Sequence, residues 1–358
     1  MKKLFIFVTF IFIIGNILAQ TTVFSDDFST NTSDTWTTSG QIGSSSFYVN
    51  RSGADWGARR STTNKLELTN DASSTDNVAG WVLAYTPTAY FGSPYNKTLA
   101  SNPDIVTWYF NMRQSRTDPA GFSGTSYGVA FILAGTSNTS NNTGSGYAVA
   151  LGQSGGTDPI RLIKYSAGLA SSTNIIISNT TGLTDFGTEY LSIKVTYNPS
   201  NNSWELFLRN DGTTAFNNPM AGELTSQGSL VDNTYTLSDN LNYMGAYWQG
   251  STGANQTAFF DNITVTVAGG ESSNITVNPT SLTDFSYVDG SGPSSEKSFS
   301  VTGSNLTADL TVSIAADAHF EISSTSGGTF GNSLSYTPTD GSVSATVYVR
   351  MKAGLEPG

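Results

Sequence analysis

The chain has no cysteine, a single histidine and few charged side chains, which make up 12% of its 358 residues. Without cysteine, disulfides contribute nothing, and stability rests on core area and strand pairing. A lipid-modified N-terminal cysteine is excluded for the same reason. Because His319 is the only imidazole, histidine-dependent catalytic triads and imidazole-rich zinc sites are excluded from most of the chain.

Basic side chains are also scarce. The 16 lysines and arginines are outnumbered by 27 aspartates and glutamates, which gives a formal net charge of −11. Proteins that bind nucleic acid line the phosphate backbone with basic side chains, and no basic stripe is present here. The composition therefore argues against a nucleic-acid partner, whereas an acidic surface is compatible with an extracellular protein.

Aromatic and small residues are abundant, with 20 Phe, 16 Tyr, 6 Trp and 36 Gly. Together with many Ser, Thr and Asn residues, they point to numerous short strands joined by turns. No stretch keeps the helical period of apolar residues over a dozen positions. The sequence therefore predicts an all-β protein, long enough for two or three domains.

The N-terminus carries a targeting pattern. Two lysines at positions 2 and 3 precede an apolar run over residues 4–18, and Ala19-Gln20 is a plausible cleavage point. A transmembrane anchor is the alternative, but the apolar run is short for a span and polar residues follow at once. We expect residues 1–19 to be a signal peptide. The mature protein is then secreted, extracellular or at the cell surface, without membrane insertion after cleavage.

The stretch Phe259–Val267 predicts the last strand of a large β-domain, with Val23–Phe28 as its partner from the other end. Ile105–Arg113 alternates apolar and polar residues, as a half-buried antiparallel strand does. Tyr190–Tyr197 and Ser203–Leu208 flank a turn rich in Pro and Asn and predict a hairpin. Strands at this spacing, with no helices between them, predict an antiparallel two-sheet sandwich.

Five segments of the chain carry a family resemblance: an opening DDF at 26–28, GYAVALG at 146–152, IRLIKYSAG at 160–168, LSIKVTYNPSNNSWELFL at 191–208 and FFDNITVTV at 259–267. Together they resemble a concanavalin A-like sandwich of the laminin G or jelly-roll type, as in secreted surface proteins of Bacteroidetes. The resemblance covers residues 21–268 and implies a jelly-roll sandwich. This fold carries both enzymes and binding proteins, so it does not define a function.

Residues 269–273 form a predicted linker, and residues 274–358 form a second predicted domain. The segments ITVNPTSL, FSVTGSNL, FEIS and VYVRMKAGL resemble immunoglobulin-like spacer modules of the same secreted proteins. About five strands are visible where an immunoglobulin-like sandwich has seven. We therefore expect an incomplete, truncated module belonging to a longer protein.

Catalytic groups are not evident in residues 21–268. Retaining glycosidases need two carboxylates that reach one cleft. None of the four glutamates here (Glu67, Glu189, Glu205 and Glu223) has a second acid at the spacing that one strand face requires. The adjacent pair Asp26 and Asp27 would point to opposite faces of a strand. The sequence predicts no catalytic residue and a protein that is not an enzyme.

One hypothesis is that a structural calcium ion binds where the first and last strands of the domain meet. Asp27 and Asp261 are the candidate ligands, with Asn262 or backbone carbonyls completing the shell, because calcium takes oxygen ligands. The alternative is that Asp261 and Asn262 point outward while Phe260 and Ile263 pack inward.

For sugar recognition, an aromatic surface and planar polar groups are needed. Two groups of residues are the candidate ligand contacts: Tyr109, Asn111 and Arg113 on the polar face of one strand, and Trp248 and Gln249 near the end of another. Trp56 lies in a loop with Arg51, Arg59 and Arg60. The alternative for all these aromatics is packing in the core or at its rim.

The function hypothesis is a secreted binding or adhesion module that contacts a glycan or another cell-surface polymer, with the second domain as a spacer. Two alternatives stay open. One is a non-catalytic accessory region of a larger secreted hydrolase or nuclease, whose catalytic domain lies beyond residue 358. The other is a structural adhesin segment without a small-molecule site.

Overall fold

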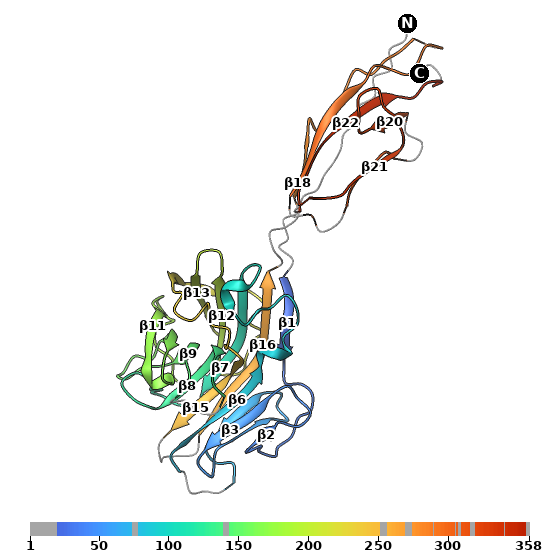
Figure 1. The fold of residues 1–358 in the computed structure, drawn as a ribbon. Coiled ribbons are helices and arrows are strands. Elements are labelled where there is room, and N and C mark those ends of the chain that lie inside the picture. The colour runs from blue at the N-terminus through green and yellow to red at the C-terminus, as the bar shows by residue number, and fades with distance from the viewer. Residues whose placement is uncertain are drawn as a thin grey trace. The chain divides into compact units, whose positions relative to one another are not determined.

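A computed structural model describes residues 20–73, 78–138, 143–250, 256–268, 274–288, 290–304, 306, 309–315, 319–339 and 341–355. The predicted signal peptide and linker lie outside the described residues. Two compact units are present, one of residues 20–269 and one containing residues 270–358 (Figure 1). Among the described residues, no helix has the length and apolar character needed to cross a membrane.

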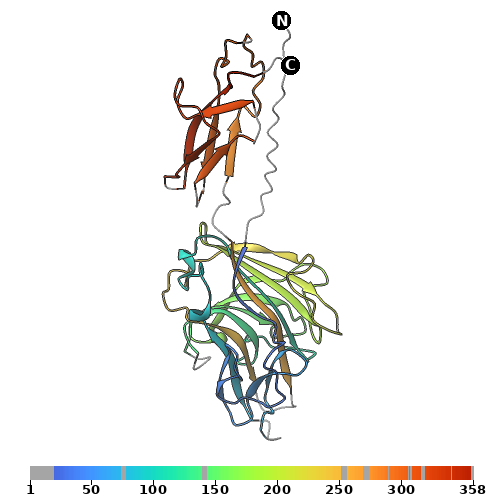
Figure 2. The same cartoon turned by 90° about the vertical axis from the view of Figure 1, so that its right-hand side faces the viewer.

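The first unit consists of two antiparallel sheets, here called sheet 1 and sheet 2 (Figures 1 and 2). The strands of sheet 1 are β1 (Gln20–Asp26), β4 (Gly57–Arg60), β5 (Leu66–Thr69), β7 (Val106–Gln114), β12 (Leu191–Asn198), β13 (Ser203–Asn210), β14 (Thr225–Val231) and β16 (Thr257–Ala268). The strands of sheet 2 are β2 (Gly40–Gln41), β3 (Tyr48–Ser52), β6 (Gly80–Pro87), β8 (Gly128–Gly135), β9 (Gly146–Leu151), β10 (Ile160–Tyr165), β11 (Ser172–Ile177) and β15 (Tyr243–Gly250).

Sheet 1 has the strand order β14-β13-β12-β7-β16-β5-β4, with β1 paired to β16, and sheet 2 has the order β11-β10-β9-β8-β15-β6-β3-β2. The helical elements within the described part of this unit are three 3-10 turns: η1 (Thr88–Tyr90), η2 (Leu99–Ser101) and η3 (Leu169–Ser171). The predicted all-β, antiparallel two-sheet sandwich is confirmed.

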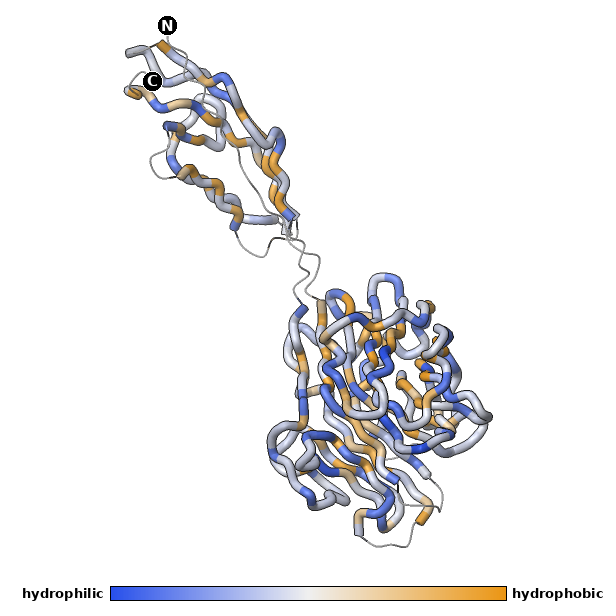
Figure 3. Tube along the Cα trace, turned by 180° about the vertical axis from the view of Figure 1, so that it is seen from behind, coloured by the Kyte–Doolittle hydropathy of each residue, from blue (hydrophilic) through white to orange (hydrophobic). Residues whose placement is uncertain are grey.

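The core lies between the two sheets because alternate residues of each strand point inward. In β7, Trp108, Phe110 and Met112 are fully buried. The ring of Phe110 stacks on Phe131 of β8, with centroids 4.2 Å apart, which joins the two sheets directly. Apolar and polar stretches accordingly alternate along the strand traces in Figure 3. Intervening residues such as Tyr109 and Asn111 lie on the outer face of sheet 1.

Strand β16 pairs with three neighbouring strands, and its pairing with β1 was predicted from the sequence. Its first half pairs with β5 and its second half with β1, while β7 runs along its other edge. A β-bulge interrupts the ladder with β7, and Asn262 there adopts a positive φ of 48°. Asparagine tolerates this left-handed conformation better than most residues. The bulge lets Phe260 and Ile263 both point into the core, where neither is exposed.

The second unit is a small β-structure of two antiparallel sheets. Apolar residues of both sheets, among them Val301, Leu310 and Val347, form one shared core. Its four-stranded sheet contains β17 (Asn274–Asn278), β18 (Lys297–Ser304), β22 (Val343–Met351) and β20 (Phe320–Ser323), and its two-stranded sheet contains β19 (Leu310–Ser313) and β21 (Ser333–Tyr336).

Candidate functional site

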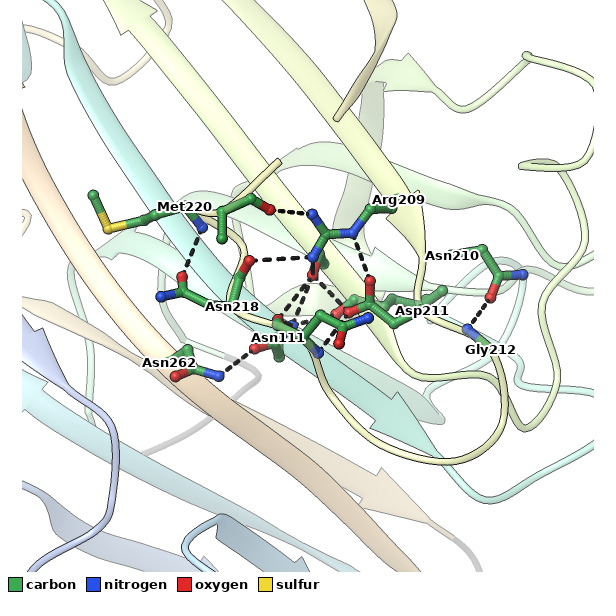
Figure 4. A network of polar contacts seen from close by, with 12 residues as sticks. Asn111, Arg209, Asn210, Asp211, Gly212, Asn218, Met220 and Asn262 are labelled. Carbon is green, nitrogen blue, oxygen red and sulfur yellow. Dashed lines mark hydrogen bonds and ion pairs between the residues drawn. The ribbon is translucent and has the colours of Figure 1, made fainter. Parts of the chain in front are cut away.

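Asn111 was a predicted ligand contact. Its side chain lies on the outer face of sheet 1, where a loop covers it and leaves it fully buried. Its amide nitrogen donates to Leu191 O, Ser192 Oγ and Asn217 O at 3.0–3.1 Å. Its oxygen accepts a hydrogen bond from Asn262 Nδ2 at 2.8 Å (Figure 4). Since a loop covers this residue and its polar atoms are all bonded, the prediction that Asn111 contacts a ligand is corrected.

The covering loop, residues 211–222, is held to sheet 1 by a buried carboxylate (Figure 4). Asp211, whose side chain is 0% exposed, accepts hydrogen bonds from Arg209 Nε and Ser192 Oγ, both at 2.7 Å. Arg209 also donates to the carbonyls of Asn218 and Ala221. These contacts are charge-assisted and well satisfied, so they position the loop rather than present groups to a ligand.

Arg113 was another of the predicted ligand contacts. In the structure its guanidinium lies 4.5 Å from the ring centroid of Tyr190 and 5.5 Å from that of Phe259. Its Nε donates to Thr188 O at 2.7 Å. Packing between two aromatic rings therefore accounts for Arg113. Tyr109 lies on the same outer face, half-buried, and burial raises the pKa of its hydroxyl.

The second predicted pair, Trp248 and Gln249, belongs to sheet 2, and its members point to opposite faces. Trp248 is 3% exposed and packs edge-on against the fully buried Trp56, with centroids 4.9 Å apart. Core packing thus corrects the prediction for Trp248. Gln249 lies on the outer face and accepts a hydrogen bond from Tyr247 at 2.7 Å. The five predicted contacts are therefore divided between two sheets and are not brought together.

The arginines near Trp56 also have internal partners. Arg60 forms a two-pronged ion pair with Asp26, at 2.5 and 2.9 Å. Arg59 pairs with Glu67 at 2.8 Å, and Arg51 donates to Trp56 O at 2.9 Å. The ion pairs of Arg60 and Arg59 join β4 to β1 and β5, and all three arginines are bonded to protein groups within the described part of the chain.

Asp27 and Asp261, the predicted calcium ligands, lie close enough to interact electrostatically. Burial raises the pKa of Asp261 to about 7, and the charge of Asp27 adds to this increase. Asp261 accepts the backbone N–H of Asn262 at 2.8 Å. Asp27 accepts hydrogen bonds from the hydroxyl and N–H of Ser29, and these lower the pKa of Asp27.

These two carboxylates do not complete a calcium shell by themselves. Calcium takes about six to eight oxygen ligands. Asp26, the nearest third carboxylate in sequence, is paired with Arg60. Within the residues that the structure describes, no group of three or more His, Cys, Asp or Glu side chains could hold a metal ion. The calcium site therefore stays a prediction that rests on two side chains.

A cavity of about 730 Å³ lies on the outer face of sheet 2, where β3 and β6 pair and β15 begins. Alternation along these strands creates it, because Val49, Ala84 and Met244 point into the core and their neighbours point outward. Its described lining includes Tyr48, Tyr85, Tyr95, Tyr243, Asn96, Asn138, Asn242 and Lys97.

Three tyrosines that line the cavity, Tyr48, Tyr85 and Tyr243, form a row of rings that Tyr90 extends beyond the lining. Tyr48 and Tyr85 are directly opposed across strands β3 and β6, with ring centroids 5.8 Å apart and planes 28° apart. Tyr90, 52% exposed, continues the row at 6.4 Å from Tyr48, and Tyr243 closes the other end at 5.5 Å from Tyr85. The rings of Tyr48, Tyr85 and Tyr90 are offset and near-parallel, an arrangement that aromatic pairs favour. The row spans several rings, and its Tyr90 end is exposed to solvent.

Hydrogen bonds fix the ends of this row. The hydroxyls of Tyr48 and Tyr90 bond to each other at 2.9 Å, which raises the pKa of Tyr48. At the other end Lys97 Nζ donates to Asn242 Oδ1 at 3.0 Å. Within the described part of the chain, the side-chain nitrogens of Asn96 and Asn242 donate to no protein group. They are therefore available as donors to a molecule in the cavity.

The rest of the outer face of sheet 2 is covered by its own loops. Phe122 and Leu169 pack on Leu83, Ile163 and Tyr247 to form a second apolar cluster. The tyrosine row lies beside this covered part of the face, and its Tyr90 end is exposed. Among the described lining residues Lys97 is the sole charged side chain, and no Asp, Glu or His is present.

Sequence patterns gave one signal for this cavity, namely the aromatic density of the segment Tyr85–Tyr95, which holds four aromatic residues. The other two rings of the row come from distant strands. Tyr48 lies on β3, a strand that was not predicted, and Tyr243 is the first residue of β15.

Fold and cavity together define the first unit as an antiparallel β-sandwich with a solvent-accessible aromatic site. No protein-family model and no curated protein sequence matches the chain. Solved structures with a similar fold include three legume proteins. Arcelin-5, a lectin-like defence protein of Phaseolus vulgaris, is 15% identical, covers 64% of this chain and 94% of its own, and has a TM-score of 0.40.

Lectin II of Ulex europaeus is 12% identical over 64% of this chain and 95% of its own, with a TM-score of 0.41. The basic lectin of winged bean, solved with the Tn-antigen, is 11% identical over 70% of this chain and all of its own, with a TM-score of 0.43. These similarities concern the fold, which the strand pairing above establishes independently. They do not identify a ligand of this chain.

Proposed function

We propose that the first unit is a non-catalytic carbohydrate-binding module whose sugar site is the tyrosine-lined cavity. The observation that carries the proposal is the row of Tyr90, Tyr48, Tyr85 and Tyr243 beside two amide donors. Aromatic rings pack against the apolar faces of sugar rings, and amides bind sugar hydroxyls in fixed directions. A row of several rings suits an oligosaccharide better than a single sugar.

Binding without turnover is part of the proposal. Glycoside hydrolysis requires two carboxyl groups on either side of the scissile bond. The described lining of the cavity supplies no carboxylate. Hydrolysis of any polysaccharide by this chain alone would contradict the non-catalytic proposal.

The biological setting is proposed from the sequence. The N-terminal pattern supports secretion, with action outside the cell or at its surface. The second unit, with six strands in two sheets, supports an immunoglobulin-like spacer. A sugar-binding unit on a spacer suits both an adhesion module and an accessory region of a larger secreted enzyme.

A glycan array with the whole chain, read with and without calcium, tests the proposed function. The tightest oligosaccharide is then titrated against the variant Tyr85→Ala and the matched control Tyr109→Ala, another half-buried strand tyrosine, on the outer face of sheet 1. We expect Tyr85→Ala to weaken binding at least about tenfold, or about 1.4 kcal/mol, as truncation of a central aromatic contact does. Tyr109→Ala should leave the affinity unchanged.

Two results would contradict the proposal. One is the absence of binding to every glycan, with or without calcium. The other is a glycan whose affinity Tyr109→Ala lowers and Tyr85→Ala does not, which would place the sugar on sheet 1.

A further inference from the structure

The charge of the cavity differs from that of the chain. Over the whole chain acidic residues outnumber basic ones and the net charge is −11. In the described lining of the cavity the balance is reversed, because Lys97 is present and no carboxylate is. A cation without a nearby carboxylate keeps its charge available to a ligand, and an anionic ligand meets no like charge among these lining groups.

The ammonium of Lys97 lies at one end of the tyrosine row. Its Nζ is bonded to Asn242 Oδ1 at 3.0 Å, and Asn242 directly precedes Tyr243 in the chain. The unpartnered side-chain nitrogens of Asn242 and Asn96 belong to residues beside the same ammonium. This end of the cavity therefore gathers one positive charge and two N–H donors, which is a suitable set for an anionic oxygen group.

The backbone that carries Lys97 is fixed before any ligand binds. Asn102, only 5% exposed, accepts the N–H of Asn96 and donates to the Asn96 carbonyl, both at 2.8 Å. On the facing side, Thr88 N–H donates to Asn242 O at 2.8 Å. Preorganised groups lose less entropy on binding, so the backbone at this end of the cavity needs little rearrangement to meet a ligand.

We propose, on the basis of the carbohydrate-binding function above, that the cavity selects acidic oligosaccharides. Sugar rings stack along the tyrosine row, and a carboxylate or sulfate on one of them binds at Lys97, Asn96 and Asn242. The shared chemistry is an anionic oxygen group on a sugar. Uronic acids and sulfated sugars are its two sources.

The experiment compares matched pairs of ligands with the whole chain, in EDTA, by calorimetric titration. One pair is an oligogalacturonate and its fully methyl-esterified, neutral form. The other is a sulfated galactan oligosaccharide and its desulfated form. We expect at least one acidic member to bind about tenfold or more tightly than its neutral partner. Its affinity should fall as salt is raised, because salt screens a charge pair near the surface.

Variants of Lys97 test whether this residue causes the preference for acidic over neutral oligosaccharides. Lys97→Gln should abolish the difference in affinity within the preferred pair and the salt dependence of that difference. Lys97→Arg should retain the preference because it keeps the charge. The carboxylate arm and the sulfate arm separately show which anionic source is favoured.

Equal affinity for acidic and neutral members in both pairs, with binding still lost in Tyr85→Ala, would overturn the acidic preference and leave the proposed function intact. An unchanged preference in Lys97→Gln would also overturn it. Absence of binding to all four ligands and to the wider glycan array would overturn the proposed function itself.

Discussion

The two outer faces of the sandwich carry similar residue types and use them differently. On sheet 1, the polar groups around Asn111 bond to one another and to the loop 211–222 that covers them. On sheet 2, the rings of Tyr48, Tyr85 and Tyr243 line a cavity together with side-chain amides. A polar, aromatic strand face is therefore not by itself a binding surface. What distinguishes the two faces is whether their polar groups already have partners.

The largest expected effect concerns the buried network of sheet 1. Asp211→Ala removes the acceptor of Arg209, Ser192 Oγ and the Asn217 N–H, so three donors lose a partner. Breaking a buried ion pair from one side commonly costs about 3–5 kcal/mol, and the partial exposure of Arg209 reduces this to about 2–4 kcal/mol of unfolding free energy.

Urea denaturation followed by tryptophan fluorescence measures this loss. All six tryptophans lie in the first unit, so the signal reports on that unit alone. The exposed Asp239→Ala is the matched control and should change stability by less than about 0.5 kcal/mol. Glycan affinity of folded Asp211→Ala should be that of the parent chain. A stable variant with altered glycan binding would make the sheet 1 network a ligand site.

The next effect is a pH dependence at the β16 bulge. The pKa of Asp261 is about 7 in the folded chain against an ordinary 3.8, because burial disfavours its charged form. The stability gained because the folded chain holds this proton more tightly is fully present below about pH 4, the unfolded pKa, and is lost as pH rises through about 7, the folded pKa. Each pKa unit is about 1.4 kcal/mol, and partial exposure reduces the sum to on the order of 2 kcal/mol.

Asp261→Asn keeps the acceptor for Asn262 N–H and cannot ionise. In EDTA, we expect its stability relative to the parent to rise between pH 5 and pH 8. A constant difference over this range would show that Asp261 titrates normally. Replacing EDTA with calcium at pH 8 tests the predicted metal site in the same experiment. A calcium-dependent rise in Tm that Asp261→Ala abolishes supports the site, and no shift with calcium removes it.

The smallest expected effect concerns Arg113. Its replacement tests directly whether the outer face of sheet 1 takes part in glycan binding. Arg113→Met loses the contacts of the guanidinium with Tyr190 and Phe259, worth about 0.5–1 kcal/mol at an exposed site, and keeps much of the side-chain volume. We expect a destabilisation of about 1 kcal/mol and unchanged glycan affinity. The exposed Arg116→Met, two residues beyond the end of β7, is the control and should change neither quantity. If Arg113→Met weakened glycan binding and Arg116→Met did not, the binding surface would lie on sheet 1.

Local sequence pattern predicted the strands that are regularly alternating or continuously apolar. The predicted strand Ile105–Arg113 is β7, Val106–Gln114, and the pairing of β1 with β16 was also predicted. The missed strands are polar or short. Tyr48–Ser52 contains Asn, Arg and Ser, and Gly57–Arg60 ends in two arginines that form ion pairs with Glu67 and Asp26 of other strands.

The candidate site was harder to predict than the fold. Alternation correctly placed Trp108 inward and Asn111 outward, but periodicity does not reveal that the loop 211–222 covers Asn111. The tyrosine row joins β3, β6, η1 and β15, which are far apart in sequence. Only tertiary pairing brings Tyr48 opposite Tyr85 and Tyr243 beside them. The cavity is therefore a property of strand order, which local patterns do not contain.

The most direct measurement is a crystal structure of the whole chain with its tightest-binding oligosaccharide. The account predicts sugar density in the sheet 2 cavity, in contact with Tyr48, Tyr85 and Tyr243, with the anionic group within hydrogen-bond distance of Lys97 Nζ. Density over Tyr109 and Arg113 on sheet 1, with the tyrosine cavity free of sugar, would contradict it.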